Sequence, residues 1–283
     1  MSTKKNASTE VAEVENTNAV AVYDEEMTGL LAEDNGTGLE ETDGDSFSIP
    51  YLLLLQALSP IVQDNAGDPN FMQGLFMNSV SQETMKEVEF IPCHYQRRFI
   101  AWAQSGGRGG ASFRGMFTPS EVEGNTLQDI EKDGTKYIWT NEEGETCDLV
   151  DTRIHYIMYK NPNSDTFEPA IISLSGTQVK QSKRLITMAR TVQVTVNGKK
   201  INPPSWAFVY KATSIKQKNE KGQWFGWEFN RCGQVTDAVL FRACKELHDS
   251  VLGGETKMQA PQKDVEAAPV DDGNPNDSED KEF

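Results

Sequence analysis

The stretch 206–229 reads WAFVYKATSIKQKNEKGQWFGWEF, and it decides the fold class. Two segments rich in aromatic and β-branched residues flank the tetrapeptide NEKG at 219–222, whose residue types are typical of a turn. The pattern predicts a β-hairpin with strands over 206–216 and 223–229. Alternate side chains of a strand share one face, so each strand presents a row of rings on one side.

The same hairpin combines rings with cations. Lys216, Lys218 and Lys221 lie in or beside the turn, and Lys211 lies on the face opposite the rings of the first strand. Rings stack on unpaired bases at roughly 1–3 kcal/mol each, while cations contact phosphates. The composition suits a single-stranded nucleic-acid groove. Alternating rings also form protein cores, and a basic turn is also found at a solvated hairpin tip, so both alternatives stay open here.

Outward from the hairpin, the chain predicts an α+β, strand-rich core. The further strand candidates are 87–102, 136–139, 153–159 and 193–196, and helical spacing marks 177–190 and 235–252. Many short strands, one strong hairpin and two late helices favour a β-rich, barrel-like core of OB type, a fold that suits single-strand binding.

Charge divides the chain into three parts. Residues 1–47 carry 2 basic and 12 acidic side chains and residues 253–283 carry 3 and 9, so the net charge of −16 lies in the two ends. Both ends are poor in aromatic residues, which predicts a disordered acidic arm over 1–46 and a disordered acidic tail over 253–283. The nucleic-acid-binding core is expected over 47–252.

The core is itself polarised. Residues 120–150 carry nine acids against two lysines, and residues 151–231 carry thirteen basic side chains against five acidic ones. A local basic patch can bind nucleic acid even when the whole chain is acidic. The acidic segment 120–150 is expected as an insertion. Its C-terminal part, NEEGETCDLVD at 141–151, has three interpretations: a solvated loop, an internal phosphate mimic, or a loop ion-paired to Arg97 and Arg98.

Several classes of protein are excluded by what the sequence lacks. No stretch reaches 18 apolar residues, and MSTKKNASTE at the start has no apolar h-region, so neither a membrane span nor a secretory signal is expected. Four widely spaced cysteines favour a reducing cytoplasm. The cysteine and histidine spacings match no zinc pattern, and SGGRGG at 105–110 is not a phosphate-binding loop. We therefore expect no enzyme, no metal and no cofactor.

The C-terminal tail ends in DSEDKEF at 277–283. Phe283 supplies both a ring and the terminal carboxylate, which a partner can take in an apolar pocket and on a basic side chain. A plain solubilising tail is the alternative. The residues expected to bind a partner protein are Asp277, Glu279, Asp280, Glu282 and Phe283.

These features resemble phage single-stranded-DNA-binding proteins that combine an OB-fold core with an acidic C-terminal tail ending in an aromatic residue. The tail at 277–283 carries the resemblance, more loosely joined by the hairpin at 206–229 and by SGTQVKQSKRLITMAR at 175–190, which is similar to segments of phage replication-module proteins. The resemblance implies sequence-independent binding of single strands during phage DNA replication and recombination, in the host cytoplasm. It also implies that the tail recruits replication proteins such as DNA polymerase and competes with DNA for the basic groove.

The expected DNA contacts are aromatic and basic side chains. Stacking is expected from Tyr95, Trp102, Trp206, Tyr210, Trp224 and Trp227. Phosphate contacts are expected from Arg97, Arg98, Lys180, Lys183, Arg184, Lys211, Lys216, Lys218 and Lys221. Exchange of tails between subunits would favour a homodimer. Two alternatives stay open: a strand-annealing recombination mediator that assembles into rings or filaments, and a structural or virion-associated protein whose rings form a buried core and whose acidic arms dock on partners.

Overall fold

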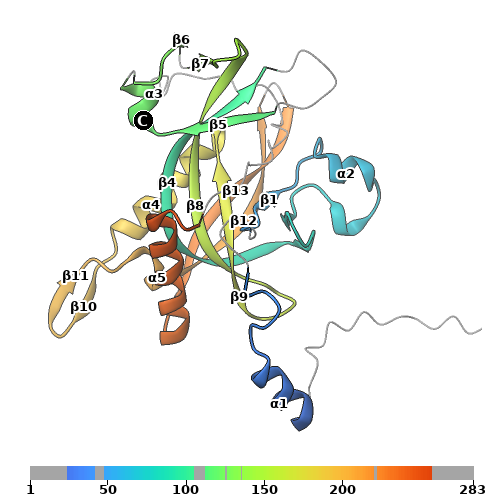
Figure 1. The fold of residues 1–283 in the computed structure, drawn as a ribbon, viewed down its shortest axis with the longest axis vertical. Helices are drawn as coiled ribbons and strands as arrows, with labels where there is room; N and C mark the ends of the chain where they lie inside the picture. The colour runs from blue at the N-terminus through green and yellow to red at the C-terminus, as the bar shows by residue number, and fades with distance from the viewer. Residues whose placement is uncertain are drawn as a thin grey trace, which may run out of the picture.

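The structure is a computed structural model that describes residues 24–41, 48–104, 112–124, 126–134, 136–219 and 222–256 (Figure 1). Lys221 lies outside these residues. So do the five tail residues expected to bind a partner protein: Asp277, Glu279, Asp280, Glu282 and Phe283. No helix among the described residues has both the length and the hydropathy needed to cross a bilayer.

Two long antiparallel strands form the centre of the fold. β4 (Glu87–Ala103) pairs with β8 (Thr146–Lys160) from Phe90 opposite Tyr159 to Ala103 opposite Cys147. We call this pair of strands the ribbon, and Figure 1 shows it running through the length of the molecule. Because both strands are much longer than a typical strand of about 5–6 residues, each accepts different neighbours at its two ends.

Within the described residues, the ribbon is shared by two five-stranded antiparallel halves. One half has the order β13-β12-β4-β8-β9 and the other has the order β5-β4-β8-β7-β6. The added strands of the first half are β9 (Phe167–Leu174), β12 (Phe208–Asn219) and β13 (Gly222–Gln234). Those of the second half are β5 (Phe113–Phe117), β6 (Ile130–Asp133) and β7 (Lys136–Thr140).

The remaining elements cover or extend the sheet. A small sheet contains β1 (Leu52–Leu54), β2 (Phe76–Asn78) and β3 (Thr84–Met85), and β10 (Val194–Val196) pairs with β11 (Lys199–Ile201). The α-helices are α1 (Glu25–Glu33), α2 (Pro60–Asp64), α3 (Pro119–Glu123), α4 (Val179–Arg190) and α5 (Ala238–Gly253). Short 3-10 turns are η1 (Pro69–Phe71), η2 (Gly176–Gln178) and η3 (Ser205–Ala207).

The structure confirms the α+β, strand-rich class and both late helices, but the barrel of OB type is wrong. The sheet path from β13 to β6 is open, because its two edge strands do not pair with each other in the described part of the chain. The length of the ribbon explains this result. Each of its strands exchanges one neighbour for another along its length, so the sheet spreads into two halves instead of curling around one core.

The expected hairpin is confirmed, and four of its rings, those of Phe208, Tyr210, Trp227 and Phe229, are buried. β12 and β13 pair throughout, with Lys218 opposite Gln223 beside the turn. Tyr210 and Phe229 are fully buried. They belong to a large core cluster that α4 and the β1–β3 sheet help to form; its fully buried rings are Phe76, Phe90, Tyr159, Tyr210 and Phe229.

Most of the acidic segment 120–150 is part of the sheet, and of the expected loop 141–151 only residues 141–145 form a turn, between β7 and β8. It forms α3, β6, β7 and the start of β8. Its apolar residues alternate with its acids, so one face can pack while the other stays charged. That face contributes to a small core cluster, whose buried members are Phe99, Ala101, Val122, Cys147 and Leu149.

The two ends of the folded part are also defined. Within the expected N-terminal arm, α1 is a helix whose residues are all exposed, and residues 1–23 lie outside the described part. At the other end, α5 stops where Gly254 adopts a left-handed conformation with φ 77°. Glycine tolerates this conformation, and the helix end agrees with the range 235–252 expected from the sequence.

The burial of Tyr210 gives a test of the core. Its hydroxyl is buried without a hydrogen-bond partner in the described structure. Tyr210→Phe removes this unsatisfied group and should raise the free energy of unfolding by about 1 kcal/mol. Tyr210→Ala should lower it by about 3–5 kcal/mol through the cavity it leaves. Urea denaturation of both variants measures the two effects, and a neutral Tyr210→Ala would show that the ring is not in the core.

Candidate nucleic-acid interface

The chain contains a long run without acids. Residues 169–219 hold nine lysines and arginines and neither aspartate nor glutamate. This run folds into most of β9, α4, the β10–β11 hairpin and β12. Six of its cations are exposed on α4 and on the hairpin, and we call them the basic surface: Lys180, Lys183, Arg184, Arg190, Lys199 and Lys200.

Packing of α4 directs these cations outward. Ser182 and Leu185 are buried against the sheet, and Met188 and Ala189 pack on the large core cluster. Since one face of a helix is held inward, the lysines and arginines between these positions must face solvent. The β10–β11 hairpin projects away from the sheet beside α5 (Figure 1). One cation of the basic surface is partly neutralised, because Arg184 lies 3.6 Å from Glu228.

An open hollow adjoins the basic surface. Its volume is about 380 Å³, and the link after α4 and the end of β13 line it. Arg231 is exposed there, and its guanidinium carbon lies 5.0 Å from the centre of the Phe208 ring. Sequence reasoning missed Arg190, Lys199, Lys200 and Arg231. The acid-free run could have pointed to the first three.

The expected stacking residues are mostly not available to a ligand. Tyr210 is fully buried, Trp227 is 5 % exposed and Trp102 is 6 % exposed, so these three rings are core residues. Trp206 and Trp224 are half-buried. Tyr95 is the exception, with 39 % of its surface exposed. Alternating rings on the hairpin therefore reflect packing, which was the open alternative.

The expected phosphate contacts fall into separate groups. Lys180, Lys183 and Arg184 belong to the basic surface, whereas Lys216 and Lys218 are exposed near the tip of the β12–β13 hairpin. Lys211 is paired with Glu87 at 2.6 Å. Arg98 is half-buried, and its Nη1 donates to the carbonyl of Arg97 at 2.9 Å.

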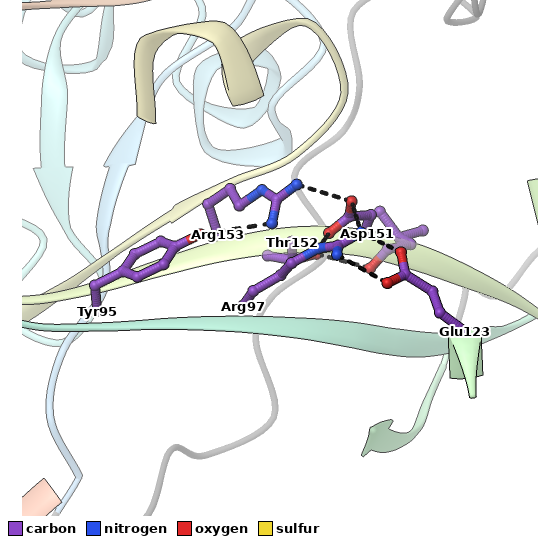
Figure 2. Close-up of polar contacts among 7 residues, drawn as sticks. Tyr95, Arg97, Glu123, Asp151, Thr152 and Arg153 are labelled. Carbon is purple, nitrogen blue, oxygen red and sulfur yellow. Dashed lines mark hydrogen bonds and ion pairs between the residues drawn. The ribbon is translucent and has the colours of Figure 1, made fainter. Parts of the chain in front are cut away.

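Arg97 and Arg153 face each other across the ribbon and form what we call the arginine pair (Figure 2). Arg97 donates from Nε and Nη2 to both carboxylate oxygens of Asp151, at 3.0 and 2.8 Å. Asp151 also accepts from Nη2 of Arg153 at 3.0 Å. One carboxylate thus holds two cations together, and this hydrogen bonding raises the pKa of Arg97.

A second carboxylate closes the outer edge of Arg97. Nη1 and Nη2 donate to Glu123 at 3.1 and 2.6 Å, which is a bidentate contact. Glu123 ends α3, within the acidic segment. An ion pair between Arg97 and the segment 141–151 was one of the sequence alternatives, and the Asp151 contact realises it.

Tyr95 and His155 extend the arginine pair toward α4. They are opposite one another on the ribbon, and their rings are 5.1 Å apart. His155 is buried and shares a 2.8 Å hydrogen bond with the hydroxyl of Ser182 in α4. Burial first, and the charge of Arg153 second, lower the pKa of His155 to about 3. This imidazole is therefore neutral at physiological pH.

The remaining histidines meet where α5 packs on the ribbon, because His248 belongs to α5 and His94 to β4. Nδ1 of His94 is 3.1 Å from Nδ1 of His248, and burial is the main cause that lowers the pKa of His94. Cys93 and Cys244 are buried in the same region. Within the described residues, no three histidine, cysteine or acidic side chains are grouped so that they could hold a metal ion.

Residues 18–257 match the model of a family described as Pam3 phage gp34-like protein. The chain belongs to this family. The matched range includes the basic surface and the arginine pair, and it leaves out residues 258–283, which are most of the acidic tail. No curated protein and no solved structure matches the chain.

The buried His155 should make stability depend on pH. Its folded-state pKa of about 3 lies below the ordinary value of 6.5, so the unfolded chain binds a proton that the folded chain excludes. As pH falls from about 6.5 toward 3, this residue should lower the free energy of unfolding by up to about 1.4 kcal/mol per unit. Denaturant titrations at several pH values should show a shallower dependence for His155→Gln. Equal slopes for the two proteins would contradict the burial of this imidazole.

Proposed function

We propose that the protein binds single-stranded DNA without sequence preference. The observation that carries the proposal is the basic surface: six exposed cations on α4 and the β10–β11 hairpin, within a run of sequence that has no acid. An exposed surface of one sign attracts phosphates even when the protein as a whole is acidic. Contacts to phosphate carry no base information, which supports binding that is independent of sequence.

The hollow beside the basic surface favours an unpaired strand over a duplex. Arg231 lines this hollow, and unpaired bases stack on arginine planes as well as on rings. The bases of a duplex are stacked on each other and cannot enter such a hollow. The buried rings of the β12–β13 hairpin have no direct part in this scheme; they hold the sheet that supports α4.

The family supports the biological setting of the proposal. Its description names a phage protein, which suits a role in phage DNA replication or recombination in the host cytoplasm. In this proposal the acidic tail has two functions. It competes with DNA for the basic surface, and residues 277–283 recruit replication proteins such as DNA polymerase. Exchange of tails between neighbouring copies would favour a homodimer.

Neutralising part of the basic surface should weaken binding. Lys180→Gln, Lys183→Gln and Arg190→Gln, combined, remove three cations that face solvent on α4. We expect the dissociation constant for oligo-dT to rise roughly 10- to 100-fold, since a hydrogen bond to a charged group contributes about 1 kcal/mol or more. The slope of log affinity against log salt should become shallower by about two, because each lost phosphate contact removes about 0.7. Fluorescence titrations over a salt series measure both quantities.

A matched variant controls for net charge. The control combines three substitutions that change the charge by the same amount at exposed positions: Lys86→Gln just before β4, Lys136→Gln on β7 and Arg242→Gln on α5. This variant should bind nearly as the wild type does. Equal losses in the two triple variants would contradict a site on α4. Absence of binding by the wild type at low salt would favour the structural or virion-associated alternative, and faster annealing of complementary strands would favour the annealing mediator.

Removal of the tail should strengthen binding. A chain that ends at Thr256 keeps the bonds from Thr256 to Ser250 that close the end of α5, so the fold should be unaffected. This truncation removes eight acids and three lysines of the tail. Without a competing polyanion, the affinity for oligo-dT should rise, and most strongly at low salt where screening is weakest. An unchanged affinity at every salt concentration would show that the tail does not cover the DNA site.

A further inference from the structure

The arginine pair occupies a polar gap between two apolar clusters on one face of the ribbon. On β8, the side chains of Leu149, Asp151, Arg153, His155 and Ile157 share this face because they alternate along the strand. Leu149 belongs to the small core cluster and Ile157 to the large one. The gap between the clusters is left to charged side chains, and part of it reaches solvent: Arg97 has 28 % of its side chain exposed and Glu123 has 42 %.

The two carboxylates of this gap have different positions. Asp151 lies between the two guanidinium groups and binds both of them. Glu123 binds Arg97 alone, from the outer side, through a fork in which two nitrogens meet two oxygens. Removal of Glu123 would therefore leave Asp151 in place and an arginine edge with two free donors facing solvent.

A phosphodiester has the charge and the shape to take the position of Glu123. It carries one negative charge and two acceptor oxygens, and arginine binds carboxylate and phosphate with the same bidentate geometry. Exchange of one anion for the other keeps the local charge constant. Because ion pairs of this exposure contribute little to stability, the exchange costs the fold little.

Glu123 is held in place by its own element. Thr118 and Glu121 form a capping box at the start of α3, and Val122 is fully buried in the small core cluster. The fork is thus built by the fold and does not depend on the chance position of a long side chain. It joins α4 through the face of β8, where His155, two residues from Arg153, contacts Ser182.

From these contacts we infer that Glu123 is an internal phosphate mimic. It covers a second phosphate-binding site, formed by Arg97 with Asp151 and Arg153 behind it, and a phosphate of bound DNA displaces it. Tyr95, exposed on the same face and with its hydroxyl 3.5 Å from Nη1 of Arg153, lies where a neighbouring base can stack. This inference rests on the proposed function, and it adds a contact site on the ribbon to the basic surface on α4.

The test compares the full-length wild type with Glu123→Gln in titrations with oligo-dT over a salt series. Glutamine retains the shape but loses the charge that competes with phosphate. We expect Glu123→Gln to bind about two- to fivefold more tightly, the range that an exposed ion pair spans. Adding Arg97→Gln to this variant should abolish the gain. Glu123→Asp, which is too short to complete the fork, should bind more tightly as well and serves if Glu123→Gln does not fold.

Glu131→Gln is the matched control. Glu131 is exposed on β6, and within the described residues it forms no ion pair. Its removal changes the net charge equally, so a gain equal to that of Glu123→Gln would overturn the inference in favour of a general charge effect. Unchanged affinity in Glu123→Gln, with normal binding by the wild type, would overturn the inference alone. Absence of binding by both would overturn it together with the proposed function.

Discussion

The pairing of β4 with β8 is the interaction on which the rest of the structure depends. Both strands span the whole sheet, and every other strand of the main sheet attaches directly or through one neighbour to this ribbon. The large core cluster lies on one end of it and the small core cluster on the other. The ribbon also places Arg97 opposite Arg153. Like charges directly opposite each other on two strands repel, and Asp151 offsets this repulsion by accepting hydrogen bonds from both arginines.

The edge of β4 shows how the sheet divides. β12 pairs with β4 only as far as Phe90, and the pairing of β4 with β5 begins at Phe99. Between these points, no described strand pairs with that edge. Pro92 lies in this interval, where its missing N–H leaves no donor unpaired, and a bulge between Pro92 and His94 adds one residue to the strand. The division into two halves thus begins at a position where the chemistry of the sequence tolerates it.

Sequence reasoning predicted the elements that depend on local sequence patterns. The β12–β13 hairpin follows from alternating rings around a turn of favourable composition, and α4 and α5 follow from helical spacing with a glycine stop at Gly254. It could not predict the open sheet, because the choice between a barrel and two halves depends on pairings between distant strands. It named Arg97 as an expected phosphate contact, but the partners of Arg97 depend on a register between residues 54 positions apart. The prediction that the hairpin rings stack on bases failed for a related reason. Alternation of rings indicates one covered face, and it does not say whether protein or ligand covers that face.

The bulge beside Pro92 has a consequence for how the two halves of the sheet relate to each other. Phe90 points to the same face as Tyr95 and Arg97, although one residue too many separates them for simple alternation. The extra residue shifts the alternation of side chains by one position, so odd-numbered residues after the bulge share a face with even-numbered residues before it. On each side of the bulge, side chains alternate between the two faces of the sheet, but the alternation on one side is offset by one residue from that on the other. The large core cluster and the arginine pair therefore lie on the same face of the ribbon, although Phe90 and Arg97 are an odd number of residues apart on β4.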